Sequence, residues 1–129
     1  MDNLIVEATK SSPWICFDAE NRILEIKGKS YPENASEFFA PVFEWLKKYF
    51  ASTQTAPTEV NLDIIYLNSS SSKAFLVLFD ILEQAARNGH TVHVNWRYDE
   101  DDETALELGE EFMEDLEFVS FNLVKIQDR

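Results

Sequence analysis

The chain has 129 residues, of which 45% are hydrophobic, and its 24 acidic and 11 basic side chains give a formal net charge of −13. This length and apolar content predict one globular domain, residues 1–129, and exclude a disordered chain. The strong negative charge argues against binding to nucleic acid or to an anionic membrane surface, and it favours a protein partner with a basic surface.

The cysteine content and the N-terminal sequence indicate the compartment. Cys16 is the only cysteine, which excludes an intrachain disulfide and a thiolate metal cluster. Its strand-like apolar neighbours predict a buried structural thiol. The first residues lack the basic region and apolar run of a signal peptide, and no apolar stretch approaches a membrane span. We therefore expect a cytoplasmic protein.

The first elements expected along the chain are a hairpin and a helix. Short apolar runs at residues 14–18 and 23–26, joined by a turn at Asn21-Arg22, predict two antiparallel strands. Ser36 is a plausible helix N-cap, and apolar side chains then recur at helical spacing to about Ala51. This pattern predicts an amphipathic helix.

A polar linker, a strand and a second helix come next. Residues 52–58 read as the linker, and the β-branched residues within 60–65 predict the strand. The strongly apolar segment 74–85 predicts a helix. Asn88-Gly89 would end it, because glycine readily adopts the left-handed conformation of a helix C-cap.

The last elements complete an alternating pattern. Residues 91–98 predict a strand, residues 103–115 a third helix and residues 119–126 a final strand, so the expected order is β-β-α-β-α-β-α-β. Strands that alternate with helices require right-handed crossovers. We therefore expect an α/β fold with a mixed, mostly parallel sheet covered by helices.

Two unusual polar segments would lie at one edge of this sheet. The run 66–73, Tyr-Leu-Asn-Ser-Ser-Ser-Ser-Lys, stands where a strand passes into a helix, and the acidic run 99–103, Asp-Glu-Asp-Asp-Glu, follows the next strand. The carboxyl ends of parallel strands share one edge, where functional loops gather. We therefore expect the two runs to be neighbours.

The serine run allows two interpretations that the residues alone leave open. Asn68 or a serine could cap the helix by accepting a backbone N–H of its first turn, worth about 1 kcal/mol. One cap residue suffices, however, and consecutive serines suit a helix poorly, so a modification or ligand role is equally well supported. Phosphorylation would add about −1.5 to −2 charges where backbone N–H groups and the helix dipole favour an anion.

No other motif composes a catalytic or metal site. Ser70–Lys73 matches the S-x-x-K motif of penicillin-recognising enzymes, but the chain is too short for these enzymes and lacks their other motifs. A solvated loop with helix N-terminal acids explains the acidic run better than a Mg²⁺ site does. His90 and His93 have the wrong spacing for a metal pair on a strand. We expect no enzymatic activity, no metal and no cofactor.

Five blocks of sequence together resemble one protein family. They are residues 30–34, 38–42 with 45–46, 66–73, 96–103 and 109–112, in this order. In these blocks the chain resembles the SiaC family of bacterial regulatory phosphoproteins. The resemblance implies a fold like the STAS domains of anti-sigma-factor antagonists, and partner switching by a dedicated protein kinase and a PP2C-type phosphatase. It also implies that the unphosphorylated form binds and activates a diguanylate cyclase, which promotes cyclic-di-GMP synthesis and biofilm or aggregation behaviour.

The resemblance also implies a phosphoacceptor. In the family it is the hydroxyl residue directly after the Asn of the motif, which here is Ser69. The family usually has Thr at this position, so Ser70, Ser71 and Ser72 become alternates. We thus expect a non-enzymatic regulator gated by phosphorylation. The residues expected to contact its partners are Asn68, Ser70, Lys73, Tyr98, Asp99, Glu100, Asp101 and Asp102.

Two alternative classes of function use the same sequence features. A small ligand-binding or enzymatic α/β domain could use the edge formed by residues 68–73 and 99–103, and it would need a pocket with converging polar groups. A structural adaptor would use its serines only to cap a helix.

Overall fold

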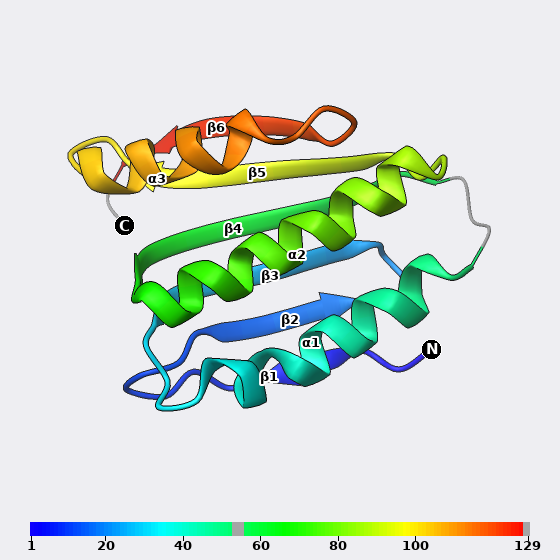
Figure 1. Ribbon diagram of the computed structural model, residues 1–129, viewed down its shortest axis with the longest axis horizontal. Helices are drawn as coiled ribbons and strands as arrows, with labels where there is room; N and C mark the ends of the chain where they lie inside the picture. Colours follow the sequence, from blue (N-terminus) through cyan, green and yellow to red (C-terminus); the bar gives the residue numbers. More distant parts are fainter. Residues whose placement is uncertain (53–55, 128–129) are drawn as a thin grey trace.

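The computed structural model describes residues 1–52 and 56–127. Within them, a six-stranded sheet carries three helices (Figure 1). The elements in chain order are β1 (Leu4–Val6), β2 (Trp14–Asp18), β3 (Ile23–Ser30), α1 (Ala35–Phe50), β4 (Thr58–Leu67), α2 (Ser69–Arg87), β5 (Val92–Asp99), α3 (Glu103–Glu114) and β6 (Ser120–Ile126). The predicted order is confirmed, with the short strand β1 added before it. Residues 53–55 of the predicted linker lie outside the described part of the chain.

The strands lie side by side in the order in which they occur in the chain. β1, β2 and β3 pair antiparallel, whereas β3, β4, β5 and β6 pair parallel, so the sheet is mixed and mostly parallel as expected. Each parallel connection contains one helix and steps in the same direction across the sheet. Right-handed crossovers therefore place α1, α2 and α3 on one face (Figure 1).

The hydrophobic core lies between this face and the helices. Alternate side chains of the central strands point into it, and α1 and α2 meet through Phe39 and Phe75, whose ring centroids are 5.9 Å apart. Trp96 on β5 anchors the third helix, because its fully buried indole N–H donates to the Ala105 carbonyl at 2.9 Å. The buried hydrophobic strand residues are Ile15, Phe17, Leu24, Ile26, Val60, Leu62, Ile64, Val92, Val94, Trp96 and Tyr98.

A side-chain cap marks the beginning of α1, and backbone hydrogen bonds mark the end of α2. Asn34 caps α1 by accepting the Glu37 backbone N–H at 3.1 Å, so the predicted cap Ser36 is wrong and lies within the first turn. The end of α2 is as predicted. The N–H groups of Asn88 and Gly89 return to carbonyls of the last turn, and Gly89 has a φ of +108°.

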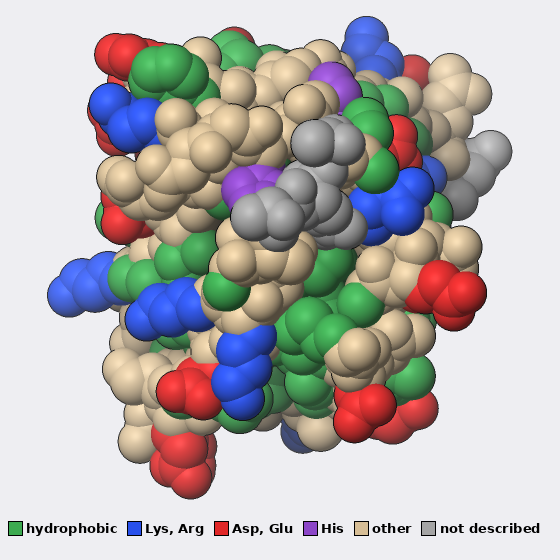
Figure 2. All heavy atoms as spheres, turned by 90° about the vertical axis from the view of Figure 1, so that its right-hand side faces the viewer, with side chains coloured by type: hydrophobic (Ala, Val, Ile, Leu, Met, Phe, Trp, Pro, Cys, Tyr) green, Lys and Arg blue, Asp and Glu red, His purple; other side chains and the backbone are tan. Residues whose placement is uncertain are grey.

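The two ends of the sheet differ in their side chains. The carboxyl ends of the parallel strands and the beginnings of α2 and α3 lie at the left of Figure 1. Figure 2 shows the opposite end, where Lys, Arg and His side chains are exposed among apolar and acidic ones. The last turns of α1 and α2 contribute Lys47, Lys48 and Arg87, cations that suit the negative end of a helix dipole. His90 bonds the Phe50 carbonyl at 3.0 Å, a structural role as predicted.

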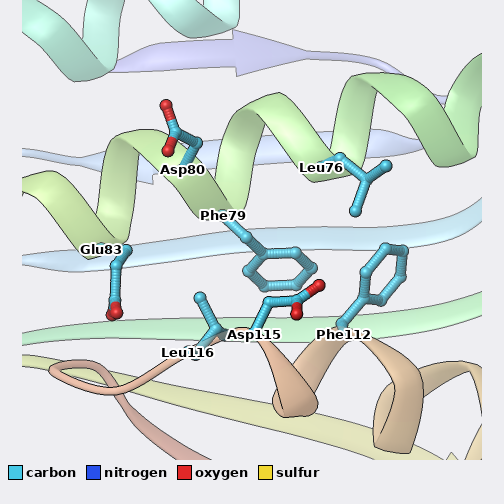
Figure 3. A pocket seen from close by; sticks show the side chains of 7 residues that line it. All are labelled: Leu76, Phe79, Asp80, Glu83, Phe112, Asp115 and Leu116. Atoms are coloured by element: carbon cyan, nitrogen blue, oxygen red, sulfur yellow. The ribbon is translucent and has the colours of Figure 1, made fainter.

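The surface between α2 and α3 is hollowed by two cavities. The first has a volume of about 160 Å³, and the rings of Phe79 and Phe112, 4.8 Å apart, point toward each other in it (Figure 3). The second, of about 270 Å³, lies between the end of β4, Ser72 and the first turns of α3. Both cavities open on the helical face of the molecule.

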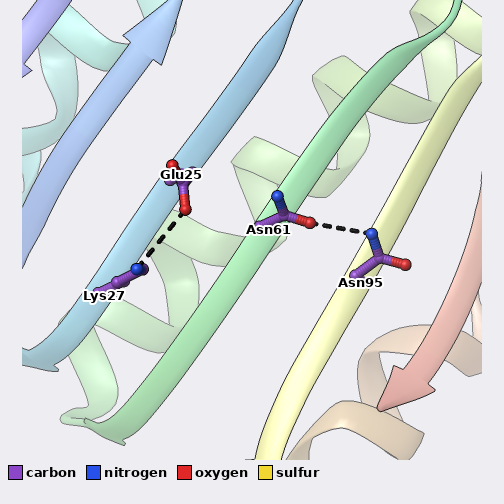
Figure 4. A network of polar contacts seen from close by, with 4 residues as sticks. All are labelled: Glu25, Lys27, Asn61 and Asn95. Atoms are coloured by element: carbon purple, nitrogen blue, oxygen red, sulfur yellow. Dashed lines mark hydrogen bonds and ion pairs between the residues drawn. The ribbon is translucent and has the colours of Figure 1, made fainter.

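The other face of the sheet is polar, and no helix of the described residues covers it. The side-chain amide of Asn95 donates to Asn61 at 2.9 Å, and Lys27 pairs with Glu25 at 3.6 Å (Figure 4). The side-chain carbonyl of Asn95 also accepts from Asn122 at 3.3 Å. The prediction of a sheet covered by helices therefore holds for one face only. The polar residues that alternate with core residues along each strand keep the other face solvated.

Cys16 lies on this polar face of β2. The thiol is partly exposed, whereas the sequence predicted a buried one. Its partial burial and the neighbouring carboxylates of Glu25 and Asp18 together raise the pKa of the Cys16 thiol. Low reactivity is still expected, because these surroundings disfavour the thiolate.

Candidate functional site

The serine run forms the first turn of α2. β4 ends at Leu67, and Asn68 caps the helix, its side-chain carbonyl accepting the Ser71 backbone N–H at 2.9 Å. The backbone N–H of Asn68 donates to the Ser30 carbonyl at the end of β3 at 3.1 Å. The capping role is thus filled by Asn68, and the serine hydroxyls are not required for it.

The four serines differ in their surroundings. Ser69 and Ser70 are exposed, and Ser72 is half-buried. Ser71 has an exposed fraction of 0%, and its hydroxyl lies 2.7 Å from that of Ser30. A phosphate on Ser71 would have to break this hydrogen bond and force the helix away from the sheet.

The exposed serines and Lys73 face different sides of α2. Ser70 and Lys73 line a cavity of about 380 Å³ between α1 and α2, together with Phe43 and Val77. Ser72 instead lines the second cavity on the α3 side. Ser69, the first residue of the helix, points to solvent between these two sides.

The acidic run forms the turn from β5 into α3. The Asp99 carboxylate accepts the Asp101 backbone N–H at 2.9 Å, and Asp102 caps α3 by accepting the Ala105 N–H at 3.0 Å. The Glu100 backbone N–H donates to the Ile126 carbonyl at 3.0 Å, which ties the turn to β6. Acids at a helix N-terminus explain this run, as the sequence interpretation favoured.

The serine and acidic runs lie at the same end of the sheet, as predicted (Figure 1). The second cavity is lined by Ser72 of the serine run and by Thr104 and Ala105, which directly follow the acidic run. Of the residues expected to contact partners, Tyr98 is only 8% exposed and belongs to the core. Asn68, Ser70, Lys73, Asp99, Glu100, Asp101 and Asp102 are exposed or half-buried.

The exposure of apolar side chains near Ser69 was not predicted from the sequence. Tyr66 is 51% exposed and meets the ring of Tyr31 edge to face, with 6.1 Å between centroids. On α2, Leu76 and Val77 are also exposed. The sequence did contain an indication of this exposure. Residues 74–79 are all apolar, and one face of a helix cannot bury six consecutive residues, so some of them must be exposed.

Neither a metal site nor a membrane-spanning helix occurs among the described residues. Among the described residues, no group of His, Cys, Asp and Glu side chains is arranged to hold a metal ion. No helix within residues 1–52 and 56–127 combines the length and apolar character needed to cross a bilayer.

Comparison with known proteins gave matches over nearly the whole chain. The model for the SiaC family of regulatory phosphoproteins matches residues 6–126. An uncharacterised protein of Pseudomonas aeruginosa strain UCBPP-PA14 is 41% identical over 118 residues, covering 92% of this chain and 93% of that protein.

Solved structures of similar fold come from the same organism. SiaC of Pseudomonas aeruginosa is 37% identical, with a TM-score of 0.90 over 98% of this chain and 100% of that chain. A crystal structure of the diguanylate cyclase SiaD in complex with its activator SiaC matches at 37% identity and a TM-score of 0.89, over 95% of this chain and 99% of that one.

Proposed function

Because this chain belongs to the SiaC family of regulatory phosphoproteins, we propose that it activates a diguanylate cyclase and is switched off by phosphorylation of Ser69. The family is one of regulators, so the chain is a regulatory protein and not an enzyme. A protein kinase would add the phosphate and a PP2C-type phosphatase would remove it. The output would be cyclic-di-GMP-dependent biofilm or aggregation behaviour. Since the kinase and the cyclase both consume nucleoside triphosphates, we place this switch in the cytoplasm.

The observation that carries this proposal is the exposed position of Ser69 directly after the cap Asn68. Ser71 is buried against Ser30, and Ser72 is half-buried, so both are poorer acceptors. A phosphate on Ser69 would lie at the positive end of the α2 dipole, which stabilises an anion. Ser70 remains the exposed alternate.

The partner surface that we propose surrounds Ser69. It comprises Asn68, Ser70 and Lys73 on α2 and the acidic turn 99–102, together with the exposed ring of Tyr66. A partner that packs on this aromatic surface would have to desolvate a phosphate on Ser69. Burying a dianion in an apolar contact is costly, so phosphorylation would release the partner.

Phosphorylation with ATP and the protein kinase that acts on this regulator in the source organism, followed by intact-mass spectrometry, tests the assignment. The wild type should gain one phosphate, Ser69→Ala none, and the matched control Ser70→Ala as much as the wild type. If Ser69→Ala is phosphorylated to the wild-type extent, the assigned site is wrong.

Titration with the cyclase of the same organism tests the switch itself. We expect Ser69→Ala to bind and to stimulate cyclic-di-GMP synthesis like the unphosphorylated wild type. Ser69→Asp, which adds a carboxylate at the same position, should bind more weakly. The proposed mechanism would be refuted if Ser69→Asp and the wild type phosphorylated on Ser69 both bound the cyclase as tightly as the unphosphorylated wild type does.

A further inference from the structure

The cleft between α2 and α3 has the properties of a helix-binding groove. We propose that it binds a basic amphipathic helix of a partner protein, whose apolar side chains enter the two cavities and whose Lys and Arg side chains contact the acidic borders. The inference deepens the proposed function and rests on it, since it gives the switch a partner of defined chemistry.

The cleft has exposed apolar surface. Leu76 lines the first cavity and is 54% exposed, while Ile65 and Tyr66 line the second and are 44% and 51% exposed. The floor of the first cavity is formed by the rings of Phe79 and Phe112 (Figure 3). Exposed apolar residues that line two cavities beside the same pair of helices indicate a site that a partner covers.

The borders of the cleft are negatively charged. Asp80 and Asp115 border the first cavity, and Glu107 and Glu111 border the second. Among the described residues that line these two cavities, none is Lys, Arg or His. An apolar cleft bordered by carboxylates is complementary to a helix whose apolar stripe is flanked by basic side chains. Lys73 faces the α1 side, where it lines a different cavity.

The size and shape of the cleft match those of a short helix. The lining residues extend from Ser72 to Glu83 along α2 and from Thr104 to the C-cap Asp115 along α3, so at the helical rise the cleft is about 16 Å long. This length accommodates about three turns of a helix. The first cavity, of about 160 Å³, is comparable to one that accepts a benzene-sized group, as an inserted Leu or Phe side chain requires.

The cleft suits a helix better than an extended strand. Its walls are the outer surfaces of two helices, whose backbone groups are bonded internally, so they offer no ladder to an added strand. A helix satisfies its own backbone hydrogen bonds and needs only side-chain contacts. Helix-in-groove recognition with anchors at i, i+3, i+4 and i+7 therefore fits this surface.

The groove and the phosphorylation site Ser69 both lie on α2. Ser69, Leu76 and Glu83 are spaced by seven residues, which places them on one side of the helix at intervals of about 10 Å. A helix seated on Leu76 would thus extend toward Ser69 at one end. The state of Ser69 could then affect whether the groove is occupied.

A titration with a model helix tests the groove. The probe is a peptide of about 18 residues made only of Leu and Lys at helical spacing, with blocked ends. Amide shifts in two-dimensional NMR should change along α2 and α3, and a Leu-Glu peptide of the same pattern should cause no change. Shift changes confined to the polar sheet face, or spread evenly over the surface, would overturn the proposal.

Two matched pairs of variants separate groove binding from general attraction to an acidic protein. Leu76→Asn should weaken peptide binding about tenfold, while Val77→Asn, at an exposed neighbour lining the α1 side, should leave it nearly unchanged. Glu111→Gln should weaken it more than Glu110→Gln, which removes the same charge from an exposed residue outside the cavity linings. Equal effects within both pairs would refute a specific groove.

The groove and the phosphoswitch can fail separately. If Ser69 is phosphorylated and controls the cyclase but the peptide does not bind the cleft, the groove is rejected and the switch stands. If the peptide binds the cleft with the expected variant pattern but Ser69 is never phosphorylated, the switch is rejected instead. Circular dichroism of each variant confirms that its fold is retained.

Discussion

The hydroxyl oxygens of Ser30 and Ser71 lie 2.7 Å apart, and both side chains are completely buried. This hydrogen bond joins the end of β3 to the first turn of α2 across 41 positions of the chain. Beside it, the Asn68 N–H donates to the Ser30 carbonyl. The sheet therefore holds the N-terminus of α2 in place, and with it the exposed Ser69.

Removing either hydroxyl should destabilise the protein. Ser71→Ala or Ser30→Ala leaves the other hydroxyl buried without its partner, at a cost of about 1–3 kcal/mol in the free energy of unfolding measured with urea. The double variant should cost less than the sum of the two, because no unpaired hydroxyl remains. Additive costs would show that the two hydroxyls are not coupled.

Gly109 allows α3 to approach Trp96, and Ala at this position should be destabilising. An added Cβ would lie 2.5 Å from Cδ1 and 2.6 Å from Nε1 of the buried indole, whose N–H is held by the Ala105 carbonyl. Although Ala favours a helix by about 1 kcal/mol over Gly, we expect a net loss of about 1–3 kcal/mol from this overlap.

Thermal and urea unfolding measure this effect. The exposed neighbour Glu110→Ala is the control and should change stability by no more than about 0.5 kcal/mol. A Gly109→Ala protein as stable as the wild type would mean that the indole can move aside.

Hydrophobic periodicity was sufficient to predict the order of most elements, but local signals of other kinds were needed for the rest. β1 has only three residues, which is too short for any alternation to be recognised. The cap of α1 could have been read from Asn34 and Glu37, a pair with the spacing of a capping box.

The uncovered face of the sheet was also encoded in the strands. In β4 the buried Val60, Leu62 and Ile64 alternate with Asn61 and Asp63. A strand buried on both faces would be apolar without interruption, so this alternation indicates a sheet with helices on one side. The sequence prediction stated that helices cover the sheet and did not specify one face.

The candidate site was predictable in place but not in detail. A strand-to-helix junction was enough to place the serine run beside the acidic run. The difference between Ser69 and Ser71 was not accessible, because it depends on a contact with Ser30 that is distant in the chain. The cleft likewise depends on how far α2 lies from α3, which no local pattern reports.

Cys16 should react slowly with thiol reagents at neutral pH. Its partial burial and the nearby Glu25 and Asp18 raise the thiol pKa, so the thiolate fraction is smaller than that of a free cysteine. Alkylation by iodoacetamide should be slower for the folded chain than for the chain in urea. Glu25→Gln removes one of the two negative charges and should speed the alkylation of the folded protein. If the alkylation rate does not change, burial of the thiol and not the Glu25 charge causes the slow reaction.

Glu83 should make the stability of the protein depend on acid pH. Its buried carboxylate accepts backbone N–H groups of Glu117, Phe118 and Val119 at 2.7, 3.0 and 3.0 Å, which fixes the loop between α3 and β6. Burial alone would raise the pKa of Glu83, but these hydrogen bonds and the charge of Arg87 outweigh it and lower that pKa below its ordinary value of 4.5.

The sign of the effect follows from this downward shift. Because the folded state holds the proton less tightly than the unfolded state, the carboxylate stabilises the fold fully above pH 4.5, and this contribution is lost as the pH falls through the folded-state pKa. Glu83→Gln cannot offer a charged acceptor to the loop. It should lower the free energy of unfolding at neutral pH by about 2 kcal/mol.

Urea unfolding at neutral and at acid pH checks this, with Asp80→Asn as control because Asp80 is exposed one turn earlier on α2. The difference in stability between wild type and Glu83→Gln should shrink as the pH falls below 4.5, while Asp80→Asn should stay within about 0.5 kcal/mol of the wild type throughout. If the loss of unfolding free energy in Glu83→Gln does not change with pH, the loop is held by packing and neutral hydrogen bonds and not by the charge of the carboxylate.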